Sequence, residues 1–138
     1  MARPHIAATI RRVIIKRALD RCEYCLLPAE WAGIPHHIDH IVPLKHGGAA
    51  HEENLAYACF ECNLAKGSDI AAFDPLTGDM TRLFHPRLDE WSTHFRLDKD
   101  HLIGMDAIGR ATAHLLHFNE PPRVQQRNLL IAADAYGL

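Results

Sequence analysis

The strongest constraint on this chain comes from its four cysteines, which form two Cys-x-x-Cys pairs, Cys22 with Cys25 and Cys59 with Cys62. Each pair presents two thiolates from one tight turn, and two such turns can enclose a tetrahedral zinc ion. A disulfide framework or a thioredoxin-like redox motif would use the same residue type. The first is typical of secreted proteins, and the second needs one pair rather than two. We therefore predict a structural four-cysteine zinc site.

The length and composition indicate an ordinary globular protein. The 138 residues suggest a single domain, 1–138, and 48% of them are hydrophobic. No apolar run approaches the ~18 residues that a membrane span requires. The first residues, MARPHIAATIRR, contain no apolar segment typical of a secretory signal. We expect a cytoplasmic protein with no membrane partner.

Between and after the cysteine pairs, the sequence predicts strand, loop, strand and helix. Residues 38–44 are rich in β-branched side chains, which predicts a strand whose regular pairing ends at Pro43. Gly47 and Gly48 predict a turn, residues 55–58 a second short strand, and residues 60–66 a helix that ends at Gly67. We expect His36 and His37 to be exposed where the first strand begins, although either side chain has the chemistry to contact phosphate or a metal.

These residues resemble the HNH endonuclease family. The family has an Asp-His pair at the end of its first strand, a Gly-Gly loop, an Asn-Leu pair entering the second strand, and a His or Asn on the helix. Its zinc-bearing branch adds two flanking Cys-x-x-Cys pairs. Here the corresponding residues are Asp39-His40, Gly47-Gly48, Asn54-Leu55 and Asn63, within residues 22–67. The segments FDPLTG, LFHPR, WSTHF and GRAT also resemble a bacterial subgroup of small HNH proteins.

The resemblance implies a role for each motif residue. His40 would be the general base that activates water, and Asp39 and Asn63 would bind one catalytic cation. Asn54 would brace the loop and orient the His40 ring. Both cation ligands offer oxygen atoms, which suits Mg²⁺ or Mn²⁺. Because neighbouring strand residues point to opposite faces, Asp39 and His40 can serve one site only if the chain bends there.

The implied activity is hydrolysis of phosphodiester bonds in DNA, which we favour over RNA. This chemistry needs a deprotonated water and stabilisation of the phosphate and the leaving oxygen. The alternative is a non-catalytic zinc-binding module that interacts with nucleic acid or protein. Such a module needs none of Asp39, His40, Asn54 and Asn63, so their joint presence favours the nuclease.

The charge is unevenly distributed, although the net charge is only −2. Residues 1–21 hold one acidic residue and six basic residues, of which Arg3 is the first. The remainder of the chain holds nine basic and sixteen acidic residues. A basic helix is predicted over 6–19, with Ile6, Ile10, Val13 and Ile14 facing the core. Arg12 and Lys16, one turn apart, are candidate contacts for nucleic acid, or a solvated helix face. Lys66 is a third candidate phosphate contact, or a cap of its helix.

The predicted fold class is α+β. It combines a ββα-metal (HNH or His-Me finger) core, the four-cysteine zinc site, an N-terminal basic helix and a mostly helical C-terminal extension over 68–138. Within the extension, residues 95–97 and 102–105 are expected to pair across a turn. Helices are predicted from the N-cap Asp106 to Phe118 and from Pro122 to about Tyr136. Trp91 and Phe95 are candidate core residues.

Overall fold

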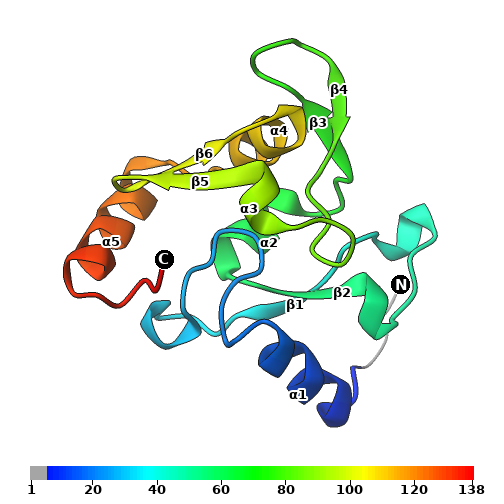
Figure 1. Ribbon diagram of the computed structural model, residues 1–138. Helices are drawn as coiled ribbons and strands as arrows, with labels where there is room; N and C mark the ends of the chain where they lie inside the picture. Colours follow the sequence, from blue (N-terminus) through cyan, green and yellow to red (C-terminus); the bar gives the residue numbers. More distant parts are fainter. Residues whose placement is uncertain (1–5) are drawn as a thin grey trace.

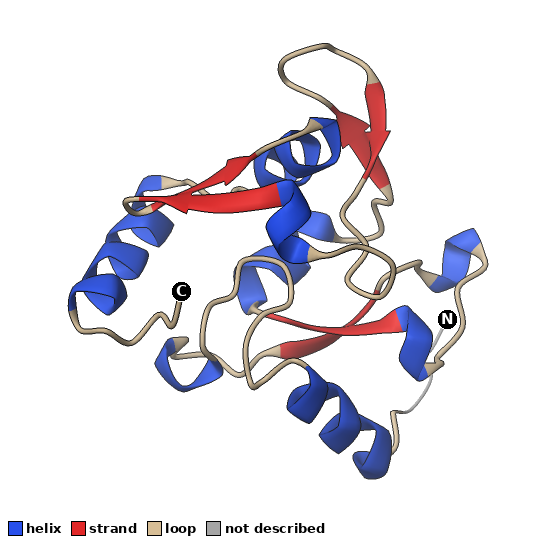
Figure 2. Ribbon diagram, in the orientation of Figure 1, coloured by secondary structure: helices blue, strands red, loops and turns tan. Residues whose placement is uncertain are grey.

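The computed structural model describes residues 6–138, so Arg3 lies outside the described residues. In this range the strands form three separate antiparallel pairs, shown in red in Figure 2, with helices packed around them. The mixture of helices and strands agrees with the predicted α+β class. No helix in the described range has the length and apolar content needed to cross a bilayer.

The first strand pair lies between two apolar clusters. Strand β1 (His37–His40) pairs with β2 (Leu55–Ala58), and Asp39 faces Ala56 across the pair. All four residues of β2 are buried, and they alternate between the two sides. Leu55 and Tyr57 pack with Ile14 of α1 (Ala8–Arg17), whereas Ala56 and Ala58 pack with the cysteines. The strand pair is therefore covered on both faces (Figure 1).

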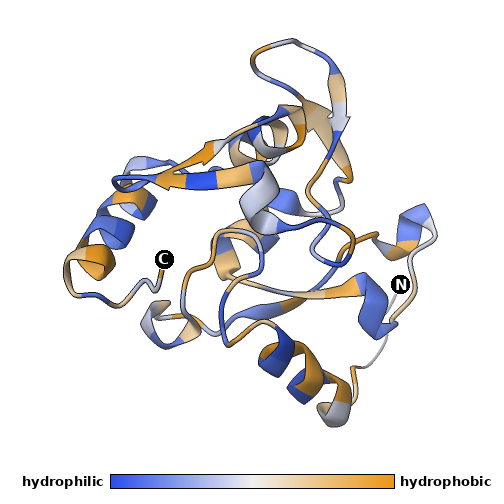
Figure 3. Ribbon diagram, viewed as in Figure 1, coloured by the Kyte–Doolittle hydropathy of each residue, from blue (hydrophilic) through white to orange (hydrophobic). Residues whose placement is uncertain are grey.

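Helix α1 packs against the strand pair through a narrower apolar side than predicted. Ile14 is fully buried, and Ile10 and Ile15 are partly buried against the same cluster. Val13 was predicted to face the core but is 47% exposed. Figure 3 shows the resulting mixture of hydrophilic and hydrophobic residues along the helix. The guanidinium of Arg17 anchors the end of α1 by donating to the backbone oxygens of Glu52 and Leu55, at 3.0 and 2.8 Å.

Helix α2 (Phe60–Lys66) follows β2 directly and has the predicted bounds. The Sγ of its N-cap, Cys59, accepts a hydrogen bond from the backbone N–H of Cys62, so the second cysteine pair begins the helix. The helix ends at Gly67, whose φ of 51° is in the range that favours glycine. The predicted strand, loop, strand and helix order is thus present, with β1 ending at His40 rather than residue 44.

The C-terminal part contains more β-structure than predicted. The hairpin β5 (Phe95–Asp98) and β6 (His101–Gly104) and the N-cap Asp106 were predicted, but the hairpin β3 (Ala71–Phe73) and β4 (Met80–Arg82) was not. The helices are α3 (Trp91–His94), α4 (Ala107–Leu115) and α5 (Pro121–Ala132). Phe95 is 1% exposed, and Trp91 packs beside it.

The C-terminal part also packs onto the first cysteine pair. The indole Nε1 of Trp91 donates to the backbone oxygen of Tyr24 at 2.8 Å. The hydroxyl of Tyr136 donates to the backbone oxygen of Cys25, and Arg21 donates to the backbone oxygen of Tyr136. The turn that presents Cys22 and Cys25 is therefore fixed by residues more than sixty positions away in the sequence.

Candidate metal centres and active-site cleft

The four cysteines form one buried cluster that can hold a metal ion. Their Sγ atoms all lie within 4.8 Å of one another, and no cysteine is more than 1% exposed. All four are free thiols. In each pair the second cysteine donates its backbone N–H to the Sγ of the first at 3.4 Å. Four thiolates at one point suit zinc, as predicted, because a closed tetrahedral thiolate set is its usual structural site.

Arg123 of α5 places its charged side chain against this cluster. Its Nη2 lies 3.1 Å from the Sγ of Cys62 and 3.8 Å from that of Cys59, while its Nη1 donates to the backbone oxygens of Leu116 and His117. Burial alone would lower the pKa of Arg123, but the negative charge of the nearby cysteine thiolates outweighs burial. The pKa of Arg123 is therefore raised above its ordinary value, and the guanidinium stays charged. No local sequence signal predicts this contact, which joins positions about sixty residues apart.

A cleft of about 340 Å³ opens beside β1 and α2. Asp39, His40 and Asn63 all line it, together with residues of the loop that follows β1, Pro43, Leu44 and Lys45. Asp39 and His40 have cross-strand partners on opposite faces of the pair, Ala56 and Leu55. Both nevertheless reach one cleft, because the strand ends at His40 and the chain bends at residues 41 and 42.

Asp39 is 5% exposed and is held by two side chains. The hydroxyl of Tyr24 donates to its Oδ2 at 2.7 Å, and the Nζ of Lys66 lies 3.2 Å from the same oxygen. Burial raises the pKa of Asp39, and the ammonium of Lys66 opposes that effect. Burial and the neighbouring Asp39 raise the pKa of Tyr24, so the phenol remains a donor. Oδ1 is held less closely, with its contact to the Nζ of Lys66 at 3.4 Å.

Asn54 closes the loop between the two strands. Its Oδ1 accepts from the backbone N–H of Val42, and its Nδ2 donates to the backbone oxygens of Val42 and Ala49, all at 2.9 Å. The Asn54 side chain thereby occupies the backbone N–H and oxygen of Val42, which a longer β1 would pair with the neighbouring strand. This explains why β1 is shorter than predicted. A Cβ at Gly48 would lie 1.7 Å from the Val42 oxygen, so only glycine fits there.

The structure places two residues differently from what residue type alone suggests. Lys66, a candidate phosphate contact or cap of its helix, is 1% exposed, and its Nζ contacts Asp39 and the backbone oxygen of His40. His36 was expected to be exposed, but it is 5% exposed, with its Nε2 2.9 Å from the backbone oxygen of Leu27. Both positions follow from long-range packing, which residue type alone does not reveal. Arg12 and Lys16 are exposed on α1, and His37 is exposed as expected.

Comparison with known proteins agrees with this geometry. Residues 22–69, which contain both cysteine pairs and the whole motif, match the family described as HNH endonuclease. The likeness to that family thus covers about a third of the chain, residues 22–69. Septu protein PtuB of Bacillus thuringiensis is 23% identical over 124 residues, which cover 88% of this chain and 46% of that protein. The chain thus spans about half the length of the curated relative that it matches. No solved structure gives a significant match.

Proposed function

We propose that the chain is a metal-dependent HNH endonuclease that hydrolyses phosphodiester bonds in DNA. The observation that carries this proposal is the cleft in which Asp39, His40 and Asn63 meet. An imidazole, a carboxylate and an amide oxygen at one opening are the groups that this hydrolysis needs. In this proposal β1, β2 and α2 are the ββα-metal core, residues 22–67 carry the motif, and residues 68–138 support it within a single domain.

His40 acts as the general base in the proposed reaction. Imidazole has an ordinary pKa near 6.5, so it can accept a proton from water at neutral pH. Asn54 holds the two ends of the loop together, and this contact fixes the backbone at Val42, two residues after His40. Lys66 holds the carbonyl oxygen of His40 itself at 3.1 Å. We infer that these two contacts orient the His40 ring toward the phosphorus atom.

Asp39 and Asn63 would hold the catalytic cation. Oδ1 of Asp39 and the amide oxygen of Asn63 are hard ligands, which fit Mg²⁺ or Mn²⁺ better than a softer metal. When bound, the cation supplies charge neutralisation for the phosphate and the leaving oxygen. Tyr24 and Lys66 hold the other side of the Asp39 carboxylate, so its orientation is fixed before a cation binds.

A plasmid-cleavage assay tests this function. Wild-type protein should cut supercoiled DNA when Mg²⁺ or Mn²⁺ is added and should be inactive without added divalent cation. His40→Ala should remain folded, keep its zinc and bind DNA, but cut at least about 100-fold more slowly, as expected for a lost general base. His37→Ala, a change at the neighbouring exposed histidine of β1, is the matched control and should cut normally.

Two results would contradict the proposal. If wild-type protein binds DNA but does not cut with either cation, the chain is a zinc-binding interaction module. If His40→Ala cuts within a few-fold of wild type, His40 is not the base. Cleavage of a matched single-stranded RNA with no cleavage of DNA would show that the substrate is RNA. The proposed hydrolysis of phosphodiester bonds would then still hold.

A further inference from the structure

A second cavity, of about 310 Å³, lies next to the proposed active-site cleft. It is bounded by residues that follow β1, by the segment after α2 and by residues 82–88. Its walls are largely aliphatic and aromatic, including Val42, Ile70, Phe84 and Leu88. Ile70 and Leu88 are 42% and 79% exposed, so the cavity opens to the surface between them. Neither the catalytic residues nor the zinc site account for this cavity.

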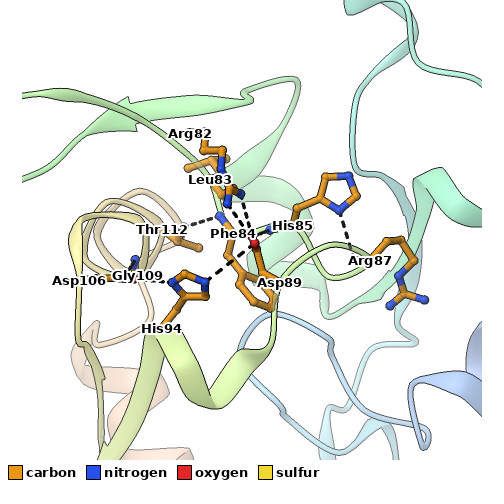
Figure 4. Close-up of polar contacts among 10 residues, drawn as sticks. All are labelled: Arg82, Leu83, Phe84, His85, Arg87, Asp89, His94, Asp106, Gly109 and Thr112. Atoms are coloured by element: carbon orange, nitrogen blue, oxygen red, sulfur yellow. Dashed lines mark hydrogen bonds and ion pairs between the residues drawn. The ribbon is translucent and has the colours of Figure 1, made fainter.

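The polar groups at the cavity are held in place by one carboxylate. Asp89 accepts two hydrogen bonds from the guanidinium of Arg82, at 2.7 and 2.9 Å, and one from the backbone N–H of His85 at 2.9 Å. Figure 4 shows Asp89 between these two residues. Arg82 and His85 both line the cavity, whereas Asp89 does not. The Asp89 carboxylate therefore holds Arg82 and His85 in place, and both of these residues remain at the cavity.

The ring of His85 has a defined donor atom. Its Nδ1 accepts a hydrogen bond from the backbone N–H of Arg87 at 3.2 Å. Burial lowers the pKa of His85, which keeps the ring neutral at neutral pH. A neutral ring whose Nδ1 accepts must carry its proton on Nε2. Within residues 6–138 the structure gives this Nε2 no hydrogen-bond partner, so it can donate to a ligand.

These features specify the chemistry of a ligand. The polar side chains that line the cavity belong to Lys66, Arg82 and His85, and none of the lining residues is acidic. The ligand must therefore present hydrogen-bond acceptors. The extensive apolar wall makes a bare phosphate a poor match, because phosphate has no apolar surface to bury. A flat, partly apolar ring with carbonyl oxygens on its edge meets both requirements.

The cavity is next to the proposed site of cleavage. Lys66 lines the cavity, and its Nζ also contacts the carboxylate of Asp39 at 3.2 Å and the backbone oxygen of His40 at 3.1 Å. Ile41 and Val42, which line the cavity, directly follow His40, which lines the cleft. A nucleotide whose phosphate lies in the cleft could thus place its own base or a neighbouring base in the cavity.

We propose that this cavity, the 82–88 cavity, binds an unstacked nucleobase with a carbonyl-bearing edge, next to the phosphodiester bond that is cut. The inference rests on the proposed nuclease function. Unstacked bases are available in single strands or after base flipping, and proteins bind them through apolar contact and edge hydrogen bonds. His85 Nε2 donates to the carbonyl, Arg82 supplies further N–H groups, and Leu88 covers the face of the ring.

Binding of labelled oligonucleotides tests the proposal without cleavage. Fluorescence anisotropy is measured for oligo(dT) and oligo(dA) of equal length, with zinc-loaded protein and no added divalent cation. Thymine has carbonyl oxygens and adenine has none, so wild type should bind oligo(dT) about 3- to 10-fold more tightly, the effect of about one hydrogen bond. His85→Leu should abolish this preference, and Leu88→Glu should weaken binding of oligo(dT).

Control variants separate the cavity from general effects. His114→Leu removes an exposed histidine of α4, and Leu129→Glu adds the same charge on α5; both should keep the wild-type preference. Equal affinity of wild type for the two oligonucleotides, or an unchanged preference in His85→Leu, would overturn the proposal. A preference that depends on His85 in a protein that cuts nothing would refute the nuclease and retain the cavity. A protein that cuts DNA but binds the two oligonucleotides equally would refute the cavity proposal and retain the nuclease.

Discussion

At the scale of single residues, the central feature is the buried pair of Asp39 and Lys66. The two side chains are 5% and 1% exposed, and their charged atoms lie 3.2 Å apart. A buried ion pair adds little net stability, because desolvation offsets the attraction. Removing one partner is costly, because the other charge is left buried without compensation. The pair therefore matters less for stability than for holding Asp39 in one orientation at the cleft.

Changes to this pair should have a non-additive effect on the free energy of unfolding. Lys66→Met should lower the free energy of unfolding by about 3–5 kcal/mol, the usual cost of breaking a buried pair. The double variant Lys66→Met with Asp39→Asn should lose clearly less than Lys66→Met alone, because no buried charge remains. Urea unfolding of the zinc-loaded variants measures both values. A double variant less stable than Lys66→Met would mean that the two side chains act independently.

Asn63 should determine which cation supports cleavage. Its amide offers oxygen to a hard cation, whereas an imidazole at this position favours Zn²⁺, Ni²⁺ or Co²⁺. Asn63→Ala should require a higher Mg²⁺ concentration for half-maximal cleavage, and Asn63→His should shift activity toward Ni²⁺ or Co²⁺. Cleavage rates measured across a series of Mg²⁺, Mn²⁺, Ni²⁺ and Co²⁺ concentrations give the answer. Normal cutting by Asn63→Ala at limiting Mg²⁺ would exclude Asn63 as a ligand.

At the scale of elements, α5 is joined to the cysteine cluster through Arg123. A zinc ion with four thiolates has a net charge of −2, and a buried guanidinium 3.1 Å from one sulfur offsets part of it. The helix that carries Arg123 begins more than fifty residues after the second cysteine pair. Packing of α5 and retention of the metal should therefore depend on each other.

Arg123→Met should weaken zinc retention. Outer contacts to metal ligands typically change metal affinity by about 10- to 100-fold, and we expect an effect of this size. Zinc transfer to a chromogenic chelator measures the change without reference to activity. Arg127→Met is the matched control, because Arg127 is also buried on α5 but donates to Asp100, Phe118 and Tyr136 rather than to a cysteine. Equal zinc loss from both variants would assign the effect to the helix as a whole.

The elements also show what the sequence could predict. Local signals sufficed for β2, for α2 and its glycine end, for the β5–β6 hairpin and for the cap at Asp106. The hairpin β3–β4 was missed because each strand has only three residues, too few for a periodic pattern. Asp74, the first residue of its loop, accepts two hydrogen bonds from Arg110 of α4 and so attaches the hairpin to that helix. That contact depends on the tertiary fold.

The same distinction applies to the candidate site. Cysteine spacing predicted the metal cluster, and the motif predicted three residues that line one cleft. The contacts of Tyr24, Lys66 and Arg123 could not be predicted, because each joins positions distant in the sequence. For Lys66, residue type alone suggests a surface position, because lysine is rarely buried unless it is paired. Its partner, Asp39, is known only from the fold.

At the scale of the whole molecule, the proposed function requires a protein of net negative charge to bind DNA. The net charge of −2 gives no general attraction to phosphate, so binding has to rely on a local concentration of positive charge. Helix α1 provides one. Arg11, Arg12 and Lys16 are exposed on it, whereas the fourth basic residue, Arg17, is used to anchor the helix to β2. The free cations of α1 thus face solvent on a rigidly attached element.

Reversing two of these charges should reduce the salt dependence of DNA binding. Each phosphate contact contributes about 0.9 to the slope of log affinity against log salt concentration, so Arg12→Glu with Lys16→Glu should flatten it by about 2. Fluorescence anisotropy with a duplex, measured at several salt concentrations without divalent cation, gives the slope. Arg96→Glu with Lys99→Glu makes the same charge change on exposed residues of the β5–β6 hairpin and should affect the slope less. Equal slopes for the two double variants would show that DNA responds to total charge only. A smaller slope specific to the first variant would identify α1 as the DNA-facing element, because two proteins of equal net charge would then differ only in where that charge lies.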